Sequence, residues 1–175
     1  MAKTALISII CADHAGLIAD VTGRLFDLGV NLADTTFAVL GGGAEFTLVA
    51  RLPEGISLAD IEADLKDLSL LADAKLTVQP FQYRESHDEN AQITHRVEIV
   101  GDDNPGLIAR LSEALPQFDT NIVRLNSESV PSASGARFVL RMALSVPPDK
   151  AASCMAAIAN TAGQLQLKCH WQEVR

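Results

Sequence analysis

A motif that occurs twice constrains this chain more than any other feature of its sequence. Residues 13–19, Asp-His-Ala-Gly-Leu-Ile-Ala, return at an offset of 90 residues as residues 103–109, Asp-Asn-Pro-Gly-Leu-Ile-Ala. Asn31 returns at the same offset as Asn121, so each copy has an asparagine 18 residues after its aspartate. A repeat at a fixed offset is the signature of one structural unit used more than once. The sequence therefore predicts two units with the same fold.

The repeat also divides the chain. With 175 residues, of which 48% are hydrophobic, the chain can form two compact cores, each in a unit of about 80 residues. Residues 82–92 are polar and almost free of large aliphatic side chains, which is typical of a linker. We therefore expect a first domain at residues 1–81, a linker at 82–92 and a second domain at 93–175.

The first unit is expected to contain four strands and two helices. Residues 5–11 are an apolar run of strand length, and further strands are expected at 32–40 and 46–52, around a Gly-rich hairpin at 41–44, and at 75–81. Between them, apolar residues at spacings of three and four predict two amphipathic helices, the first ending at Gly29 and the second capped by Ser57. The two stripes are Leu17, Ile18, Val21, Leu25 and Leu28, and Leu58, Ile61, Leu65, Leu68 and Leu71.

The second unit repeats this order. Strands are expected near residues 94–100, 121–130, 136–146 and 164–171. Pro116 lacks an amide donor and should shorten or kink the first helix. The two helical stripes are Leu107, Ile108, Leu111, Leu115 and Phe118, and Ala151, Cys154, Met155 and Ile158.

The order strand, helix, strand, strand, helix, strand predicts an α+β fold class. Right-handed crossovers combined with one hairpin give an antiparallel four-stranded sheet with both helices on one face, which is the ferredoxin-like arrangement. We expect one such βαββαβ domain in each half of the chain.

The repeated turn has a structural and a functional interpretation. Asp13 and Asp103 can each cap a helix, and Gly16 and Gly106 can each permit a tight turn. The same geometry also exposes backbone amides at a helix N-terminus, which suits the carboxylate of a small ligand. An aspartate and an asparagine could then hold an ammonium group. The residues alone do not decide between the two.

Two βαββαβ copies that each open with Asp-x-x-Gly-Leu-Ile resemble tandem ACT domains, over nearly the whole chain apart from the linker. Among such proteins the chain looks most like the glycine cleavage system transcriptional repressor family. The resemblance implies a regulatory protein that binds a small amino acid, with glycine favoured, and controls glycine cleavage gene expression through a protein partner. It places the ligand at a domain interface, where it contacts Asp13, Gly16, Leu17 and Asn31, with Asp103, Gly106, Leu107 and Asn121.

The two turns differ at the positions after the aspartate. His14 stands in the first copy, and Asn104 followed by Pro105 stands in the second. His14 and Asn104 are included as candidate ligand-binding residues, but the unequal turns leave the number of occupied sites open.

The charge and the cysteine content limit the kinds of partner and site that the chain can have. The chain has 22 Asp and Glu against 14 Lys and Arg that form no cluster, which argues against direct nucleic-acid binding. No signal-like segment and no run of about 20 apolar residues is present, so we expect a cytoplasmic protein and no membrane partner. Three widely spaced cysteines fit reduced thiols rather than disulfides or a metal site. We expect no cofactor.

The histidines show no Ser-His or Cys-His pairing, so we expect no enzyme activity and no catalytic residue. Asp60, Glu62, Asp64 and Asp67 form a charge run that we interpret as a solvated helix face. A detachable regulatory subunit of an amino-acid biosynthetic enzyme is the alternative function, because the fold cannot separate the two. By resemblance we also expect a homodimer, formed through sheet edges or sheet faces. Arg137, Val139 and Arg141 alternate on one strand face, as Glu45, Thr47 and Val49 do in the other copy, and either face could instead be an ordinary solvated strand face.

Overall fold

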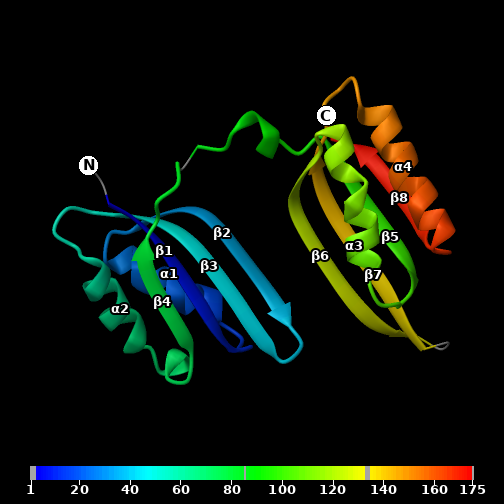
Figure 1. The fold of residues 1–175 in the computed structure, drawn as a ribbon. Coiled ribbons are helices and arrows are strands. Elements are labelled where there is room, and N and C mark those ends of the chain that lie inside the picture. The colour runs from blue at the N-terminus through cyan, green and yellow to red at the C-terminus, as the bar shows by residue number, and fades with distance from the viewer. Residues whose placement is uncertain (1–2, 85, 133–134, 175) are drawn as a thin grey trace. The chain divides into compact units, whose positions relative to one another are not determined.

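The computed structural model describes residues 3–84, 86–132 and 135–174. The chain divides into two compact units, Met1–Glu85 and Ser86–Arg175, which we call unit 1 and unit 2. Figure 1 shows the same succession of strands and helices in each. The expected α+β fold is confirmed, because each unit forms one four-stranded antiparallel sheet with helices packed on it.

Within residues 3–84, unit 1 contains four strands and two α-helices in the expected order. Its strands are β1 (Lys3–Ala12), β2 (Asn31–Leu40), β3 (Gly43–Leu52) and β4 (Lys75–Pro80). Its helices are α1 (Leu17–Asp27) and α2 (Leu58–Lys66), and the 3-10 helix η1 (Ser69–Leu71) follows α2.

The described part of unit 2 has the same order. Its strands are β5 (His95–Asp102), β6 (Asn121–Ser132), β7 (Gly135–Ser145) and β8 (Lys168–Glu173). Its α-helices are α3 (Leu107–Glu113) and α4 (Ala151–Gln164), and its 3-10 helices are η2 (Glu89–Ala91) and η3 (Leu115–Phe118).

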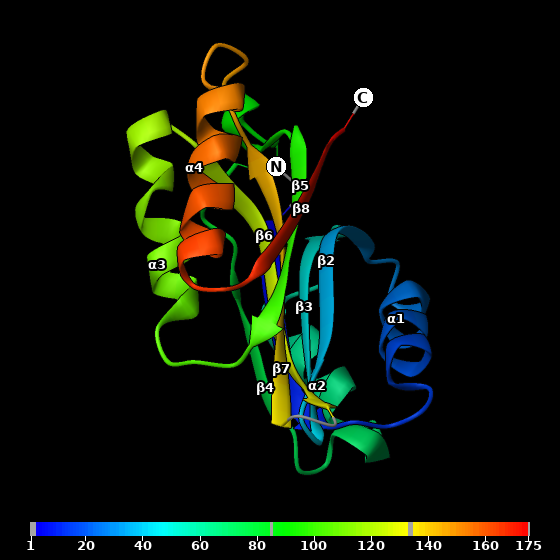
Figure 2. The ribbon, with the colours of Figure 1, turned by 90° about the vertical axis from the view of Figure 1, so that its right-hand side faces the viewer.

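Both sheets have the same strand order, β2-β3-β1-β4 in unit 1 and β6-β7-β5-β8 in unit 2. Strand β3 is antiparallel to both β1 and β2, so β1 and β2 run in the same direction. The helices cover one face of each sheet, as the turned view in Figure 2 shows for α1 and α2 and for α3 and α4. The opposite face of each sheet carries no helix of its own unit, and we call it the open face.

The cores lie between helices and sheets. Alternate residues of β1, such as Ile7 and Ile9, are fully buried against Val21 and Leu25 of α1 and Leu65 of α2. The equivalent core of unit 2 includes the expected face of α4, namely Cys154, Met155 and Ile158. Alternation along strands and the three-to-four spacing along helices thus give matching apolar surfaces.

The first helix is buried in the same way in both units. The pattern of buried, half-buried and exposed residues is identical over residues 11–30 and residues 101–120. Ile18 and Ile108 were expected to belong to the apolar stripe of the first helix of each unit. This was wrong, because Ile18 is 43% exposed and Ile108 is 36% exposed. Each follows a buried leucine at the start of its helix, where the next side chain points about 100° away from the core.

Several boundaries differ from those expected. Gly43 and Ala44 belong to β3, so Gly41 and Gly42 alone form the hairpin turn. The second helix of unit 1 ends at Lys66, and Leu68 and Leu71 continue its stripe around η1. The last strand was expected to begin at residue 164, but residues 164–167 close α4 and its turn.

Pro116 has the expected effect. Helix α3 has 7 residues, whereas its counterpart α1 has 11. The chain continues from α3 into the 3-10 helix η3, in which Pro116 is among the first residues. A proline supplies no amide to the preceding turn, so the α-helix ends before it.

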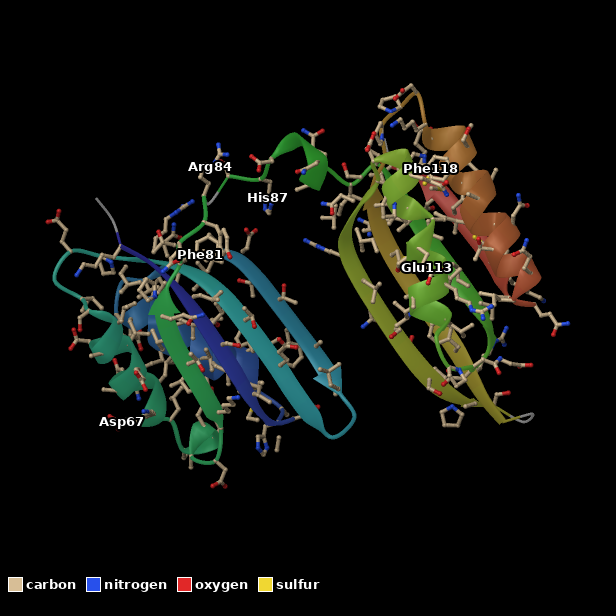
Figure 3. The ribbon with its side chains drawn as sticks, viewed as in Figure 1. Asp67, Phe81, Arg84, His87, Glu113 and Phe118 are labelled. Carbon is tan, nitrogen blue, oxygen red and sulfur yellow. The ribbon has the colours of Figure 1, made fainter. Side chains whose placement is uncertain are left out.

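The segment between the units is not wholly irregular. Residues 89–91 form η2, in which the Ala91 amide donates to the Asp88 carbonyl over 2.9 Å. Figure 3 labels Phe81, Arg84 and His87 along the chain that leaves β4. Phe81 contacts Tyr83 edge-on, with 5.7 Å between ring centroids.

Ser57 caps α2 as expected. Its hydroxyl accepts from the Asp60 amide over 3.2 Å, and the Asp60 carboxylate accepts from the Ser57 amide over 2.8 Å. This reciprocal pair is a capping box. The acidic run on α2 is therefore more than a solvated face, since Asp64 also pairs with Arg24 of α1 over 3.1 Å.

Replacing Ser57 with alanine should lower the free energy of unfolding by about 1 kcal/mol, because an amide of the first turn of α2 loses its acceptor. Urea unfolding of the full chain measures the change. Ser69→Ala is the matched control, since Ser69 begins η1 and its side chain makes no cap hydrogen bond. Equal effects of the two substitutions would contradict the capping role.

The capping box should also respond to pH. Hydrogen bonds from the Ser57 hydroxyl and then the Ser57 amide lower the pKa of Asp60. A carboxyl whose pKa is lower when folded adds stability above its unfolded pKa and loses it as the pH falls through the folded pKa. The stability advantage of the parent over Asp60→Asn should be present at neutral pH and shrink below about pH 4. An advantage that is independent of pH would contradict this.

Candidate functional site

The turn between β1 and α1 depends on a left-handed glycine. Gly16 is the N-cap residue of α1 with φ 93°, and Gly106 is the N-cap residue of α3 with φ 82°. A side chain at either position would be strained by the backbone conformation itself, because L-residues avoid positive φ. The repeated glycine is therefore explained by backbone geometry.

This turn leaves donors unpaired in unit 1. The Leu17 amide donates to the His14 carbonyl over 3.2 Å, and the Asp20 amide donates to Gly16 over 2.9 Å. Between them, the amides of Ile18 and Ala19 have no acceptor among the described residues. Two adjacent free amides at the positive end of a helix dipole are suited to an anion, as helix N-termini in general are.

The carboxylate of Asp13 does not cap α1. Its backbone amide donates to the Gly42 carbonyl over 3.2 Å, which ties the turn to the β2–β3 hairpin. Its side chain is exposed and makes no hydrogen bond to any described residue, and α1 has no side-chain cap. Capping by Asp13, one of the two interpretations of the motif, is therefore wrong.

Charge at this turn also acts on the neighbouring thiol. Burial, and secondarily the charge of Asp13, raise the pKa of Cys11 at the end of β1. A raised pKa keeps the thiol protonated near neutral pH and makes it a poor nucleophile. The turn therefore presents a carboxylate and amides rather than a reactive sulfur.

Unit 2 forms the same turn with different side chains. Asp103, Asn104 and Gly106 are exposed, and the Asn104 amide group lies 3.5 Å from the Asp102 carbonyl. Like α1, helix α3 has no side-chain cap, so Asp103 does not cap it.

Leu17 and Leu107 belong to the cores. They are 2% and 3% exposed, and each packs in the apolar cluster of its own unit. Of the predicted contact residues these two can meet a ligand only through backbone atoms.

The predicted asparagine lies far from the aspartate of its own unit. At one end of the sheet, Asn31 pairs with Arg51 of β3. At the other end, Gly43 of β3 pairs with Ala12, directly before Asp13. The eight steps from Gly43 to Arg51 correspond to about 27 Å, at about 3.4 Å per residue. One unit therefore does not bring Asp13 and Asn31 together.

Unit 2 shows the same separation. Asn121 pairs with Ser145 at one end of β7, and Asp102, directly before Asp103, pairs with Arg137 near the other end. The side-chain amide of Asn121 also donates to the Asn90 carbonyl of η2 over 3.0 Å. Asn121 is thus engaged by the segment that precedes β5, whereas the Asn31 side chain makes no hydrogen bond to a described residue.

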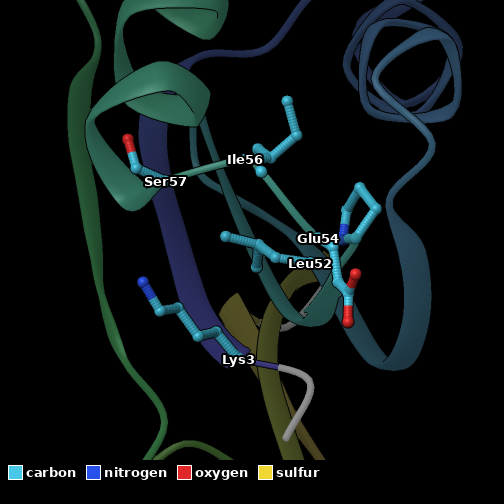
Figure 4. A pocket seen from close by; sticks show the side chains of 7 residues that line it. Lys3, Leu52, Glu54, Ile56 and Ser57 are labelled. Atoms are coloured by element: carbon cyan, nitrogen blue, oxygen red, sulfur yellow. The ribbon is translucent and has the colours of Figure 1, made fainter.

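A pocket that the sequence did not suggest lies at the Asn31 end of unit 1. Its volume is about 290 Å³, and it opens where β3 turns toward α2 (Figure 4). Its lining residues are Lys3, Leu52, Pro53, Glu54, Gly55, Ile56 and Ser57. Pro53 and Gly55 are residue types typical of turns, and a pocket that depends on the start of β1 beside such a turn has no local sequence signal.

None of the described helices is long and apolar enough to cross a membrane. A search of curated proteins finds no match to the chain. A family model described as the ACT domain matches residues 96–172, which includes nearly all of the sheet and both helices of unit 2.

Two solved structures match the chain over its full length. A protein from Galdieria sulphuraria that is described only as an unknown protein has a TM-score of 0.77 at 18% identity, with 100% of each chain covered. A protein provisionally named as a glycine cleavage system transcriptional repressor has a TM-score of 0.70 at 14% identity, covering 100% of this chain and 99% of its own. At such identities the likeness shows the fold. Residues 96–172 therefore match the ACT domain family model, and the chain as a whole has the fold of two ACT domains in tandem.

Proposed function

We propose that this chain is a non-catalytic regulatory protein that binds a small amino acid, with glycine favoured, and controls glycine cleavage gene expression through a protein partner. The observation that carries the proposal is the β1–α1 turn of unit 1. It presents two unpaired backbone amides, and the exposed carboxylate of Asp13 at the same turn makes no hydrogen bond to a described residue. A structure of the same fold carries the provisional name of a glycine cleavage system transcriptional repressor, which supports the choice of regulation.

The two ends of an amino acid match the two chemical groups of the turn. The ligand carboxylate accepts from the amides of Ile18 and Ala19, where the helix dipole favours negative charge. The ligand ammonium group lies against the carboxylate of Asp13, with a charge-assisted hydrogen bond. Leu17 contributes through its backbone, and Gly16 allows the approach because it has no side chain.

The asparagine must come from another unit of this fold. About 27 Å separates the turn from Asn31 in one unit at strand spacing, and glycine has only a few ångströms of reach. A second unit of the same fold would bring its own strand start to the turn. This requirement agrees with the ligand position at a domain interface that the resemblance implies.

Binding at such a site is weak enough for sensing. Glycine has five non-hydrogen atoms, and the best small ligands gain about 1.5 kcal/mol per atom, so its binding free energy is limited to about 7.5 kcal/mol. The corresponding dissociation constant is a few micromolar or weaker, about 3 μM at the limit. The protein would therefore report changes in an abundant metabolite.

A site that uses Asn121 is expected to bind more weakly than a site that uses Asn31. Asn121 already donates to the Asn90 carbonyl, and a ligand would have to displace that bond. His14 and Asn104 give the two turns different polar surfaces. The residues proposed for the second turn are Asp103, Asn104, Gly106 and Leu107.

Asp13→Ala should weaken glycine binding by about tenfold or more, because a charge-assisted hydrogen bond is worth about 1.5–3 kcal/mol. Isothermal titration calorimetry with a panel of amino acids measures the loss. Asp27→Ala is the matched control, since Asp27 is an exposed aspartate at the far end of α1. If the parent binds no amino acid, the sensor proposal fails. If Asp13→Ala binds as the parent does, the site assignment fails.

Asn31→Ala should weaken the same binding although Asn31 lies at the far end of its own sheet, because the site draws its asparagine from a different unit. Asn121→Ala is expected to have the smaller effect, since that amide is engaged by Asn90. The two single variants are titrated beside the parent. Unchanged binding in both would contradict a role for either asparagine.

A further inference from the structure

The open face of unit 2 is basic, although the chain as a whole is acidic. Residues paired across antiparallel strands lie on the same face of a sheet, so the strand register assigns the side chains of this face. Its paired residues include five Arg and Lys against three Asp and Glu, a formal net charge of +2, whereas the whole chain has −8. The basic residues are Arg96, Arg124, Arg137, Arg141 and Lys168, and the acidic residues are Glu98, Asp102 and Glu128.

Most of this positive charge is not neutralised within the sheet. Arg141 donates to Glu98 over 2.9 Å and to Glu128 over 2.5 Å, so it occupies two of the three carboxylates. The other four basic side chains are exposed and make no ion pair with a described residue. The third carboxylate, that of Asp102, lies opposite Arg137 in the register. Arg96, Arg124 and Lys168 have no acidic residue opposite them.

Two of these unpaired cations lie in one row of the sheet. Arg96 on β5 and Arg124 on β6 both pair with Ala143 of β7, the strand between them. Their Cα atoms are therefore about two strand spacings, or about 9.6 Å, apart. Ala143 places only a methyl group between them, so the two long side chains can converge on one anionic group. Because guanidinium groups bind carboxylates in a bidentate manner, the row is suited to a carboxylate.

Unit 1 does not repeat this arrangement. In the equivalent register, Leu6 takes the place of Arg96 and Thr47 takes the place of Arg141. The charged residues among the paired positions of its open face are Glu45, Arg51 and Lys75. The shared fold alone would give both units the same surface, so the basic face is a property of the sequence of unit 2.

We propose that the open face of unit 2 binds an acidic segment of the protein partner. The inference rests on the proposed function for the existence of a partner, and it does not require a bound amino acid. Arg96 and Arg124 hold one carboxylate of the segment, and Lys168 holds a second. Lys168 lies four residues along β8 from Gln172, which pairs with Arg96, or about 14 Å at about 3.4 Å per residue. Two acidic residues four positions apart in an extended segment match this distance.

A protein segment fits this face better than a nucleic acid. Base stacking on a sheet requires aromatic side chains on the exposed face, and the paired residues of this face include no Phe, Tyr or Trp. Trp171 is 51% exposed, but it pairs with the core residue Val97 and so belongs to the opposite face. Three carboxylates among the cations also repel a continuous phosphate backbone. The acidic residues of a peptide can be spaced to avoid them.

The test is the binding of a fluorescently labelled polyglutamate peptide of about ten residues to the full chain, measured by anisotropy. At about 50 mM salt the parent should bind with a dissociation constant of about 1 mM or tighter. Binding should weaken at least threefold at about 500 mM salt, because exposed charges are then screened. Arg96→Gln combined with Arg124→Gln should raise the dissociation constant about fivefold or more, since two exposed ion pairs are lost.

Arg110→Gln combined with Lys66→Gln is the matched control, because it removes two positive charges from exposed positions of α3 and α2. It should leave peptide binding unchanged. A circular dichroism spectrum like that of the parent verifies folding, and Arg124→Gln alone provides a milder variant of the same design.

Three outcomes overturn the proposal. The parent does not bind the peptide, or both double variants weaken binding equally, or an oligothymidylate of about the same charge binds more tightly than the peptide and depends on Arg96 and Arg124. The last outcome would assign the face to nucleic acid. Amino-acid titration of the parent is a separate measurement, so a chain that binds glycine but not the peptide loses only this inference, and a chain that binds only the peptide loses only the sensor proposal.

Discussion

Antiparallel pairing of β3 with both β1 and β2 is the constraint on which the rest of this structure depends. It makes β1 and β2 run in the same direction, so the end of β1 and the start of β2 lie at opposite ends of the sheet. The turn into α1 therefore sits at one end, and Asn31 at the other. Because the helices cover one face only, the same pairing leaves an open face in each unit. The separation of Asp13 from Asn31, on which the proposed ligand site depends, follows from this register.

In the site that we propose, stability and ligand recognition depend on different atoms of the turn. Gly16 adopts the left-handed conformation that starts α1, and Leu17 anchors the helix in the core. These residues hold the amides of Ile18 and Ala19 in place without pairing them. A backbone site of this kind is preorganised, because its donors are fixed by packing rather than by side-chain rotamers. Asp13 then adds the charge that the backbone lacks.

Much of the fold could be predicted from the sequence, because periodicity and the repeat report burial directly. The interruption at Pro116 and the cap at Ser57 were predictable from local chemistry. The exposure of Ile18 could not be predicted, because the spacing of apolar residues alone does not distinguish a position next to the buried stripe from a position within it. The separation of Asp13 from Asn31 was also hidden, because a sequence offset does not show which ends of two strands coincide. Likewise the bond from Asn121 to Asn90 joins residues that no local pattern relates.

The division of roles within the turn has a consequence for how its two copies can diverge. Positions 16 and 17, and their counterparts 106 and 107, are held by backbone strain and by the core. Positions 14 and 15 are exposed, and neither backbone strain nor core packing restricts their side chains. The copies are identical at the first pair and differ at the second, with His-Ala in one and Asn-Pro in the other. In the proposed site, ligand selectivity can therefore change through substitutions at these two surface positions, while the glycine and leucine that form the turn stay the same.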